Sequence, residues 1–155
     1  MKLKKFFRMM MCAVALISFA ACSNDDGDEF LIEPELTTFT GDFVIDQNDG
    51  TSFTDKGVKV SISFDLDKQI ASMVFYQAKF SPKMPVRLDM VINGVGYSAG
   101  KNDITISGNK IVPVAMGGNF EQYTITGLVG KITPSDIKFS MNCGDYPVSY
   151  VGKKN

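Results

Sequence analysis

The sequence predicts an all-β domain, either a barrel or a sandwich, from about residue 40 onward. Three observations carry this prediction. Apolar and polar residues alternate with a period of two, most clearly over 58–66 and 137–143, as they do along a strand with one buried and one solvated face. Turn-forming Gly, Asn and Pro residues separate such segments at short intervals. No window shows a convincing helical period.

About nine short strands are expected along the chain. The expected strands are 41–46, 58–66, 71–80, 87–95, 103–107, 111–115, 123–132, 137–143 and 147–152. Turn signals lie at 48–50, 65–68, 93–94, 108–109, 117–119, 133–135 and 144–145. The weakest strand is 111–115, because Pro113 removes a ladder donor and favours an edge or a bulge. Residues 81–85 are expected to form an irregular loop over one barrel end.

Before these strands the chain changes abruptly from apolar to acidic at Cys22. Four basic residues precede an apolar run, 9–21, which is shorter than the roughly 20 residues needed to span a bilayer. Residues 1–21 are therefore predicted to be a secretory signal peptide. The tetrapeptide Phe19-Ala20-Ala21-Cys22 resembles the lipobox of bacterial lipoproteins, which implies that Cys22 is lipidated and begins the mature chain. The alternative is an ordinary signal peptide with a cysteine there by chance.

The segment after Cys22 is polar and strongly acidic. Residues 23–29 cannot bury enough apolar surface to fold alone, so we expect residues 22–38 to be a tether and 39–155 to be one domain. The acidic tract resembles the export signal of surface lipoproteins of the Bacteroidetes type. This resemblance implies a lipid-anchored protein in the outer membrane, exposed at the cell surface. A plain solvated spacer, with the domain on the periplasmic face, is the alternative.

Charge limits the classes of partner. The whole chain has 16 basic and 17 acidic residues, and loss of the four basic residues of the signal peptide leaves 12 and 17, a net charge of −5. An acidic domain without a clustered basic stripe binds nucleic acid poorly, so nucleic acid is excluded as a partner. Lys153 and Lys154 are expected to be a solvated tail.

The residues for catalysis are scarce. The chain has no histidine, which removes Ser-His-Asp and Cys-His catalysis and His-ligated metals. Cys143 is the one thiol left in the mature chain if Cys22 is acylated, and it is expected to be a small buried hydrophobe. Asp65 and Asp67 form the obvious carboxylate pair for glycoside hydrolysis, but they flank a predicted hairpin. We therefore expect no enzyme, no cofactor and no metal.

Two glycine-containing motifs imitate ligand loops. Residues 94–100 follow a strand, but the last glycine is one residue late for a dinucleotide fingerprint and no helix pattern follows. This segment is predicted to be a turn. Residues 46–50 resemble part of a calcium loop, but the closing glutamate is missing. A hairpin is the favoured interpretation, and a weak calcium site is the alternative.

Four stretches together resemble a known family: AKFSPKMPVRLDMVINGV, ITISGNK, YTITGLVGKITPSDIKFSMN and YPVSYVGKK. They are similar to the calycin-like, lipocalin-like barrel domain of small Bacteroidetes-type lipoproteins. The resemblance covers nearly the whole mature domain and implies a single antiparallel barrel of about eight strands. Such a barrel can enclose one small ligand or be filled by its own side chains. The family carries no agreed activity.

Large apolar side chains suggest what the barrel does. The candidates to line a pocket for a small apolar or amphipathic ligand are Phe64, Phe75, Met90, Tyr123, Phe139 and Met141. The expected function is therefore non-enzymatic ligand binding by a lipid-anchored barrel. The alternatives are a solid core and a module whose outer face binds a partner protein or a glycan. That module would show exposed aromatic residues in a patch, with Tyr97, Tyr146 and Tyr150 as candidates.

Overall fold

The computed structural model describes residues 35–155. The predictions for the signal peptide, the lipid on Cys22 and the acidic residues before 35 lie outside this range. The described elements are β1 (Thr37–Asp46), β2 (Ser52–Asp65), β3 (Ile70–Ala78), β4 (Leu88–Ala99), β5 (Ile104–Gly108), β6 (Val114–Ala115), β7 (Gly118–Asn119), the 3-10 turn η1 (Glu121–Tyr123), β8 (Ile125–Ile132), β9 (Asp136–Cys143) and β10 (Tyr146–Lys154).

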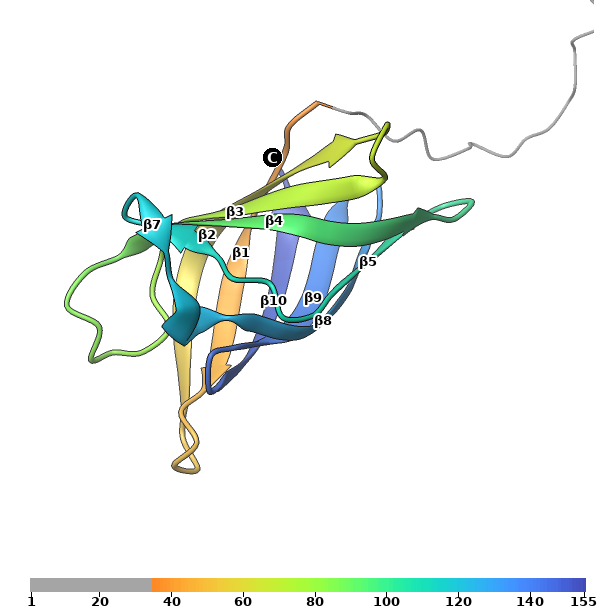
Figure 1. The fold of residues 1–155 in the computed structure, drawn as a ribbon. Helices are drawn as coiled ribbons and strands as arrows, with labels where there is room; N and C mark the ends of the chain where they lie inside the picture. Colours follow the sequence, from red (N-terminus) through yellow and green to blue (C-terminus); the bar gives the residue numbers. More distant parts are fainter. Residues whose placement is uncertain (1–34) are drawn as a thin grey trace, which may run out of the picture.

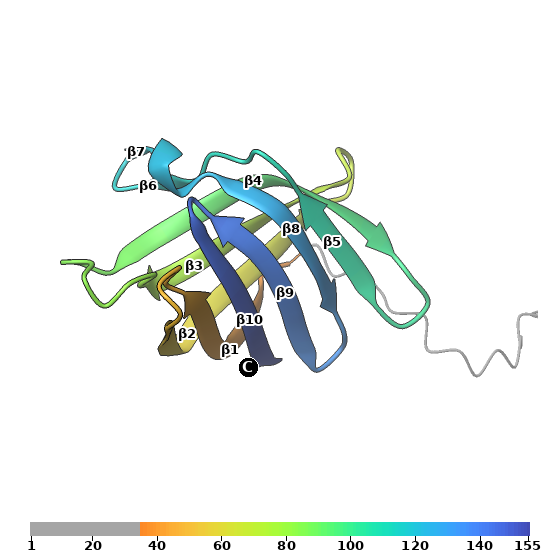
Figure 2. The same cartoon turned by 90° about the horizontal axis from the view of Figure 1, so that it is seen from below.

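Eight of these strands close into a barrel (Figures 1 and 2). Their order around the ring is β3-β2-β1-β10-β9-β8-β5-β4, and β4 pairs back onto β3. Every pairing is antiparallel, and the short strands β6 and β7 form a hairpin outside the ring that pairs with β4. The predicted all-β barrel of about eight strands is confirmed, and its architecture is consistent with a calycin-like fold.

Because neighbouring strands run antiparallel, their connections lie at two opposite ends of the barrel. The mouth end, as we name it, carries the β1–β2, β3–β4, β5–β8 and β9–β10 connections. The base end carries the other turns and both ends of the described chain, which lie side by side in Figure 1. The backbone N–H of Asn155 donates to the carbonyl of Thr38 over 3.0 Å, so the C-terminus is fixed beside the start of β1.

Aromatic rings fill the middle of the barrel. Phe43 on β1 lies with its ring centroid 5.1 Å from that of Phe75, 6.0 Å from that of Phe139 and 4.8 Å from that of Tyr150. Phe75 and Phe139 stand on β3 and β9, which lie opposite each other in the ring of eight strands. Their rings nevertheless stack at 5.7 Å. Side chains from opposite walls therefore meet, and the barrel is filled by its own residues at this level.

Two turn predictions within β4 are wrong. Asn93 and Gly94 lie inside the strand, where Asn93 pairs with Ser72 and Val95 pairs with Ala71. Gly94 is the extra residue of a β-bulge and has a φ of +78°. Most of the segment 94–100 likewise continues β4 rather than forming a turn. An Asn-Gly pair supplies left-handed backbone to bulges as well as to hairpins, which explains the error.

Several strand limits also differ from prediction. The expected strand 111–115 shrinks to β6 and an isolated bridge between Ile111 and Ile125, as the missing N–H of Pro113 allows. β1 begins at Thr37, so residues 37 and 38 belong to the barrel rather than to the tether. β10 extends through Lys154, so the two terminal lysines form part of a strand rather than a tail.

The hairpin at 46–50 is confirmed. The Asp46 carboxylate accepts a hydrogen bond of 2.8 Å from the backbone N–H of Asn48, the side-chain-to-backbone bond of an Asx turn. The Asn48 amide then donates to the carbonyl of Asp145 over 2.7 Å. The β1–β2 hairpin is thereby tied to the β9–β10 turn at the mouth end.

Candidate functional site

The six predicted pocket residues lie in the hydrophobic core or pack against it. Five of them, Phe64, Phe75, Met90, Phe139 and Met141, are buried members of the core, and Tyr123 packs against it. They contact protein side chains: Phe75 stacks on Phe139, and Phe64 meets the edge of Tyr97 at 5.0 Å. The sequence thus predicted which residues face inward. Whether they bind a ligand stays a prediction.

The mouth end is covered by the connection between β3 and β4, which includes the predicted irregular loop. Phe80 of this connection is fully buried, with its ring 5.8 Å from that of Phe43 and 5.7 Å from that of Tyr123. The Gln47 amide donates to the Phe80 carbonyl over 3.1 Å. Phe80 therefore closes the interior where an open barrel would admit a ligand.

A charged pair holds both ends of this connection. Asp55 on β2 is 2 % exposed, and its carboxylate oxygens accept bonds of 2.7 and 3.1 Å from Arg87 and one of 2.8 Å from the backbone N–H of Lys79. The hydrogen bond to Asp55 raises the pKa of Arg87. Both groups are occupied with each other, so their arrangement indicates a structural role rather than acid–base chemistry.

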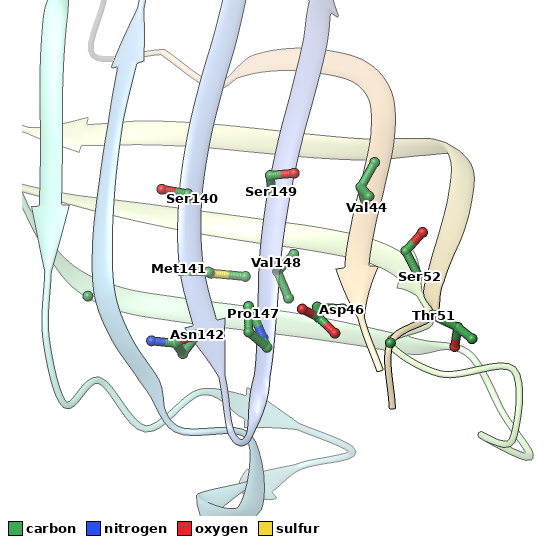
Figure 3. Close-up of a pocket in the computed structure, with 12 residues that line it drawn as sticks. Val44, Asp46, Thr51, Ser52, Ser140, Met141, Asn142, Pro147, Val148 and Ser149 are labelled. Atoms are coloured by element: carbon green, nitrogen blue, oxygen red, sulfur yellow. The ribbon is translucent and has the colours of Figure 1, made fainter. Parts of the chain in front are cut away.

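A hollow lies on the outer wall of the barrel (Figure 3). It measures about 620 Å³, and its lining comes from β1, β2, β8, β9, β10 and the β1–β2 turn. In register, Val44 pairs with Ser149, which pairs with Ser140. We name this hollow the outer groove. Its lining consists of Val44, Asp46, Gly50, Thr51, Ser52, Gly127, Ser140, Met141, Asn142, Pro147, Val148 and Ser149.

The outer groove offers polar side chains rather than open backbone. β1, β9 and β10 each have a partner strand on both sides, so the ladder leaves no free edge for an added strand. The groove instead presents hydroxyls from Thr51, Ser140 and Ser149 and the amide of Asn142. The Thr51 hydroxyl and the Thr51 backbone N–H both donate to the carboxylate of Asp49, and these bonds, the hydroxyl bond first, lower the pKa of that carboxyl.

Sequence reasoning missed the outer groove. Alternation does place Ser140 and Asn142 on the outward face of β9, opposite the buried Met141. The groove, however, arises only when β1 lies beside β10 and β10 beside β9, and the sequence does not state that register. The aromatic residues proposed for an outer patch are not exposed: Tyr150 is 1 % exposed, and Tyr97 and Tyr146 are half-buried against the core.

The carboxylate pair lies in the predicted turn. Asp65 accepts a hydrogen bond from the Lys68 backbone N–H and forms an ion pair of 3.1 Å with the Lys68 ammonium. The backbone hydrogen bond is the main cause of the lowered pKa of Asp65. Asp67 is exposed, and neither carboxylate lines the outer groove. Two partnered or solvated acids on a turn lack the facing geometry of a glycosidase.

Among residues 35–155, no three His, Cys, Asp or Glu side chains gather as a metal site requires. The same residues include no helix of the length and apolarity needed to cross a membrane.

Cys143 is a buried hydrophobe, as predicted. It is fully buried at the end of β9, and burial raises the pKa of its thiol from the ordinary 9.0 to about 12. The unfolded chain therefore forms thiolate first. The stabilising effect of keeping this thiol protonated is complete below pH 9.0 and disappears as the pH rises toward about 12.

This burial gives a testable result. In a chain of residues 22–155 that carries Cys22→Ser, iodoacetamide should label Cys143 at mildly alkaline pH only after unfolding in guanidinium, because the native protein offers almost no thiolate. Mass spectrometry of native and unfolded samples checks this. Equal labelling rates in the two samples would contradict the buried position.

Comparison of the chain with protein-family models, with curated proteins and with solved structures gives no match. The barrel and its outer groove therefore provide the basis for a function.

Proposed function

We propose that this protein is a non-enzymatic binding protein, anchored in the outer membrane by a lipid on Cys22, that recognises a neutral glycan in its outer groove at the cell surface. The observation that carries the proposal is the contrast between the two faces of the wall. Inside, rings from opposite strands are in contact. Outside, a hollow of about 620 Å³ is open, within the range of roughly 300–1,000 Å³ typical of small-ligand sites.

The chemistry of the lining favours a glycan over a protein partner. Sugar hydroxyls both donate and accept hydrogen bonds, as do the hydroxyls of Ser140 and Ser149 and the amide of Asn142. The Thr51 hydroxyl donates its proton to Asp49 and offers its oxygen as an acceptor. Energetic centres of protein interfaces are rich in Trp, Tyr and Arg, and none of these lines the outer groove. The lining carries one charged side chain, Asp46, which accepts hydrogen bonds but does not require a charged ligand.

The affinity for one glycan chain should be weak. With about four hydrogen bonds contributing about 1 kcal/mol each, the expected Kd is on the order of 1 mM. Several copies of the protein on a surface would raise the avidity toward a polymeric glycan. An array that displays neutral oligosaccharides at high density is therefore the appropriate first probe.

A matched pair of variants tests the site. Ser149→Tyr should fill the outer groove and reduce array binding by about tenfold or more, the equivalent of about 1.4 kcal/mol. Val151→Tyr lies two residues further along β10, is also outward and exposed, and stands outside the groove. It should leave binding unchanged. No array binding by the parent protein, or equal loss in both variants, would overturn the proposal.

The lipid anchor has its own test. Cys22→Ala should leave an uncleaved or soluble precursor, because the acylated side chain would be missing. Metabolic labelling with a clickable fatty acid should then mark the parent protein and miss the variant. Labelling of the variant equal to that of the parent would refute lipidation at Cys22. Protease treatment of intact cells separates surface exposure from a periplasmic position.

A second candidate function is binding of a small apolar or amphipathic ligand inside the barrel. It is favoured by the interior methionines Met73, Met90 and Met141, whose flexible side chains can repack around a guest. Native mass spectrometry of the mature protein, purified gently from its own kind of cell, tests it. A reproducible extra mass that Ser149→Tyr does not remove would support the interior site, and a clean unliganded mass would favour the outer groove.

A further inference from the structure

The charges of the chain are unevenly distributed. Residues 35–155 contain 12 basic and 12 acidic residues, so the described barrel is neutral. The net negative charge of the mature chain comes entirely from acidic residues just before the barrel, between positions 25 and 33. The acidic residues of this segment are Asp25, Asp26, Asp28, Glu29 and Glu33. We name residues 25–33 the acidic segment.

Lysines gather on the outer wall toward the base end, where the acidic segment joins the barrel. Lys131 on β8 and Lys138 on β9 pair directly across the two strands. Like charges in this relation destabilise a sheet unless a counter-charge is near. One row closer to the base, Lys153 on β10 lies across Thr40 from Lys59 on β2. We name Lys59, Lys131, Lys138 and Lys153 the basal lysine belt.

Carboxylates of the barrel neutralise only part of the positive charge of these lysines. Lys131 forms an ion pair of 3.0 Å with Asp103, and Lys153 forms one of 3.3 Å with Asp136. The carboxylate of Asp42, which pairs with Val151 of β10, accepts a hydrogen bond from the backbone N–H of Gly57. Among residues 35–155, Lys59 and Lys138 have no carboxylate oxygen within 4.0 Å.

We propose that the acidic segment docks on the basal lysine belt of the same molecule. The geometry permits it. Lys138 pairs with Val151, which pairs with Asp42, so Lys138 lies two strands across and five residues along from Thr37. With about 4.8 Å between strands and about 3.3 Å per residue, the distance is roughly 20 Å. Glu29 lies eight residues before Thr37, a reach of about 26 Å when extended.

Docking has a consequence for the position of the barrel above the membrane. Because the acidic segment is covalently joined to the barrel, its effective concentration at the belt is in the millimolar range, so several weak ion pairs suffice. A docked segment cannot also serve as an extended spacer between Cys22 and the barrel. Salt shortens the Debye length from about 10 Å at 0.1 M to about 3 Å at 1 M, so the spacing should increase with ionic strength.

The test places a spin label beside the acidic segment. In the mature chain with Cys22→Ser and Ser23→Cys, a nitroxide at position 23 should broaden the amide signals of Val129, Lys138 and Val151 at about 0.05 M salt, where screening is weak. The native Cys143 is buried and stays unlabelled. Broadening at these amides should exceed that at the mouth-end residues Lys83 and Lys110 by about fivefold or more and should vanish at about 1 M salt.

A tether of equal length but without the charge is the matched control. The variant with Asp25→Asn, Asp26→Asn, Asp28→Asn and Glu29→Gln keeps the covalent proximity and should lose the broadening. Equal broadening in both chains, or none in the parent, would overturn the proposal. A parent chain without broadening whose Lys138 and Val151 signals shift on addition of phosphatidylglycerol vesicles would assign the belt to a membrane surface instead.

Discussion

Phe43→Ala should lower the free energy of unfolding by about 3–5 kcal/mol, the range found for truncation of a fully buried phenylalanine. Phe43 is 0 % exposed, and its ring lies within 6.0 Å of four other aromatic rings, those of Phe75, Phe80, Phe139 and Tyr150. These partners come from β3, the mouth-end connection, β9 and β10. Loss of the Phe43 ring would therefore remove contacts to β3, to β9 and β10 across the barrel, and to the connection that covers the mouth end.

The neighbouring residue provides the control. Val44 is 43 % exposed on the outer wall, so Val44→Ala should change the stability by no more than about 0.5 kcal/mol. Urea unfolding of the two variants and the parent measures the difference, with an unchanged m-value expected in each. A loss below about 1 kcal/mol for Phe43→Ala would mean that the interior packs loosely there, and it would move the search for a ligand back inside the barrel.

The inward-facing residues could be predicted because strand alternation is local. A period of two places Phe64, Phe139 and Met141 on the inward face, and each is buried. Alternation fixes the direction of a side chain but not the residue that it meets. That Phe75 stacks on Phe139 depends on β3 and β9 lying opposite each other, which is set by the closure of the whole ring.

The errors have the same origin. Gly94 needs left-handed backbone in a hairpin and in a bulge alike, and only the pairing of β4 with Ala71 and Ser72 decides between them. The outer groove depends on the neighbours of β10, one of which, β1, begins more than 100 residues earlier in the chain. Asp55 likewise meets Arg87 across 32 residues, so its partner could not be predicted from a local pattern.

The pairing of β1 with β10 closes the ring, and its tightest point gives the second large prediction. Gly41 on β1 faces Gly152 on β10. A Cβ atom on Gly41 would overlap the carbonyl oxygen of Val151 and the Cα of Gly152, which are backbone atoms and cannot turn aside as a side chain can. Gly41→Ala should therefore force the two strands apart and cost about 3 kcal/mol or more, comparable with severe overpacking of a core.

Gly118→Ala is the matched control, because nothing lies within 4 Å of a Cβ atom built there. Gly118 is also in a strand, the outer strand β7, and its φ is not positive. Its substitution should leave stability within about 0.5 kcal/mol of the parent value. Urea unfolding separates the two outcomes. If Gly41→Ala unfolded at the same urea concentration as the parent, the backbones of β1 and β10 could not lie as close together at Gly41 as the structure places them. The barrel would then be closed mainly by its other strand pairs. A loss confined to Gly41→Ala would instead locate the closure at this glycine pair.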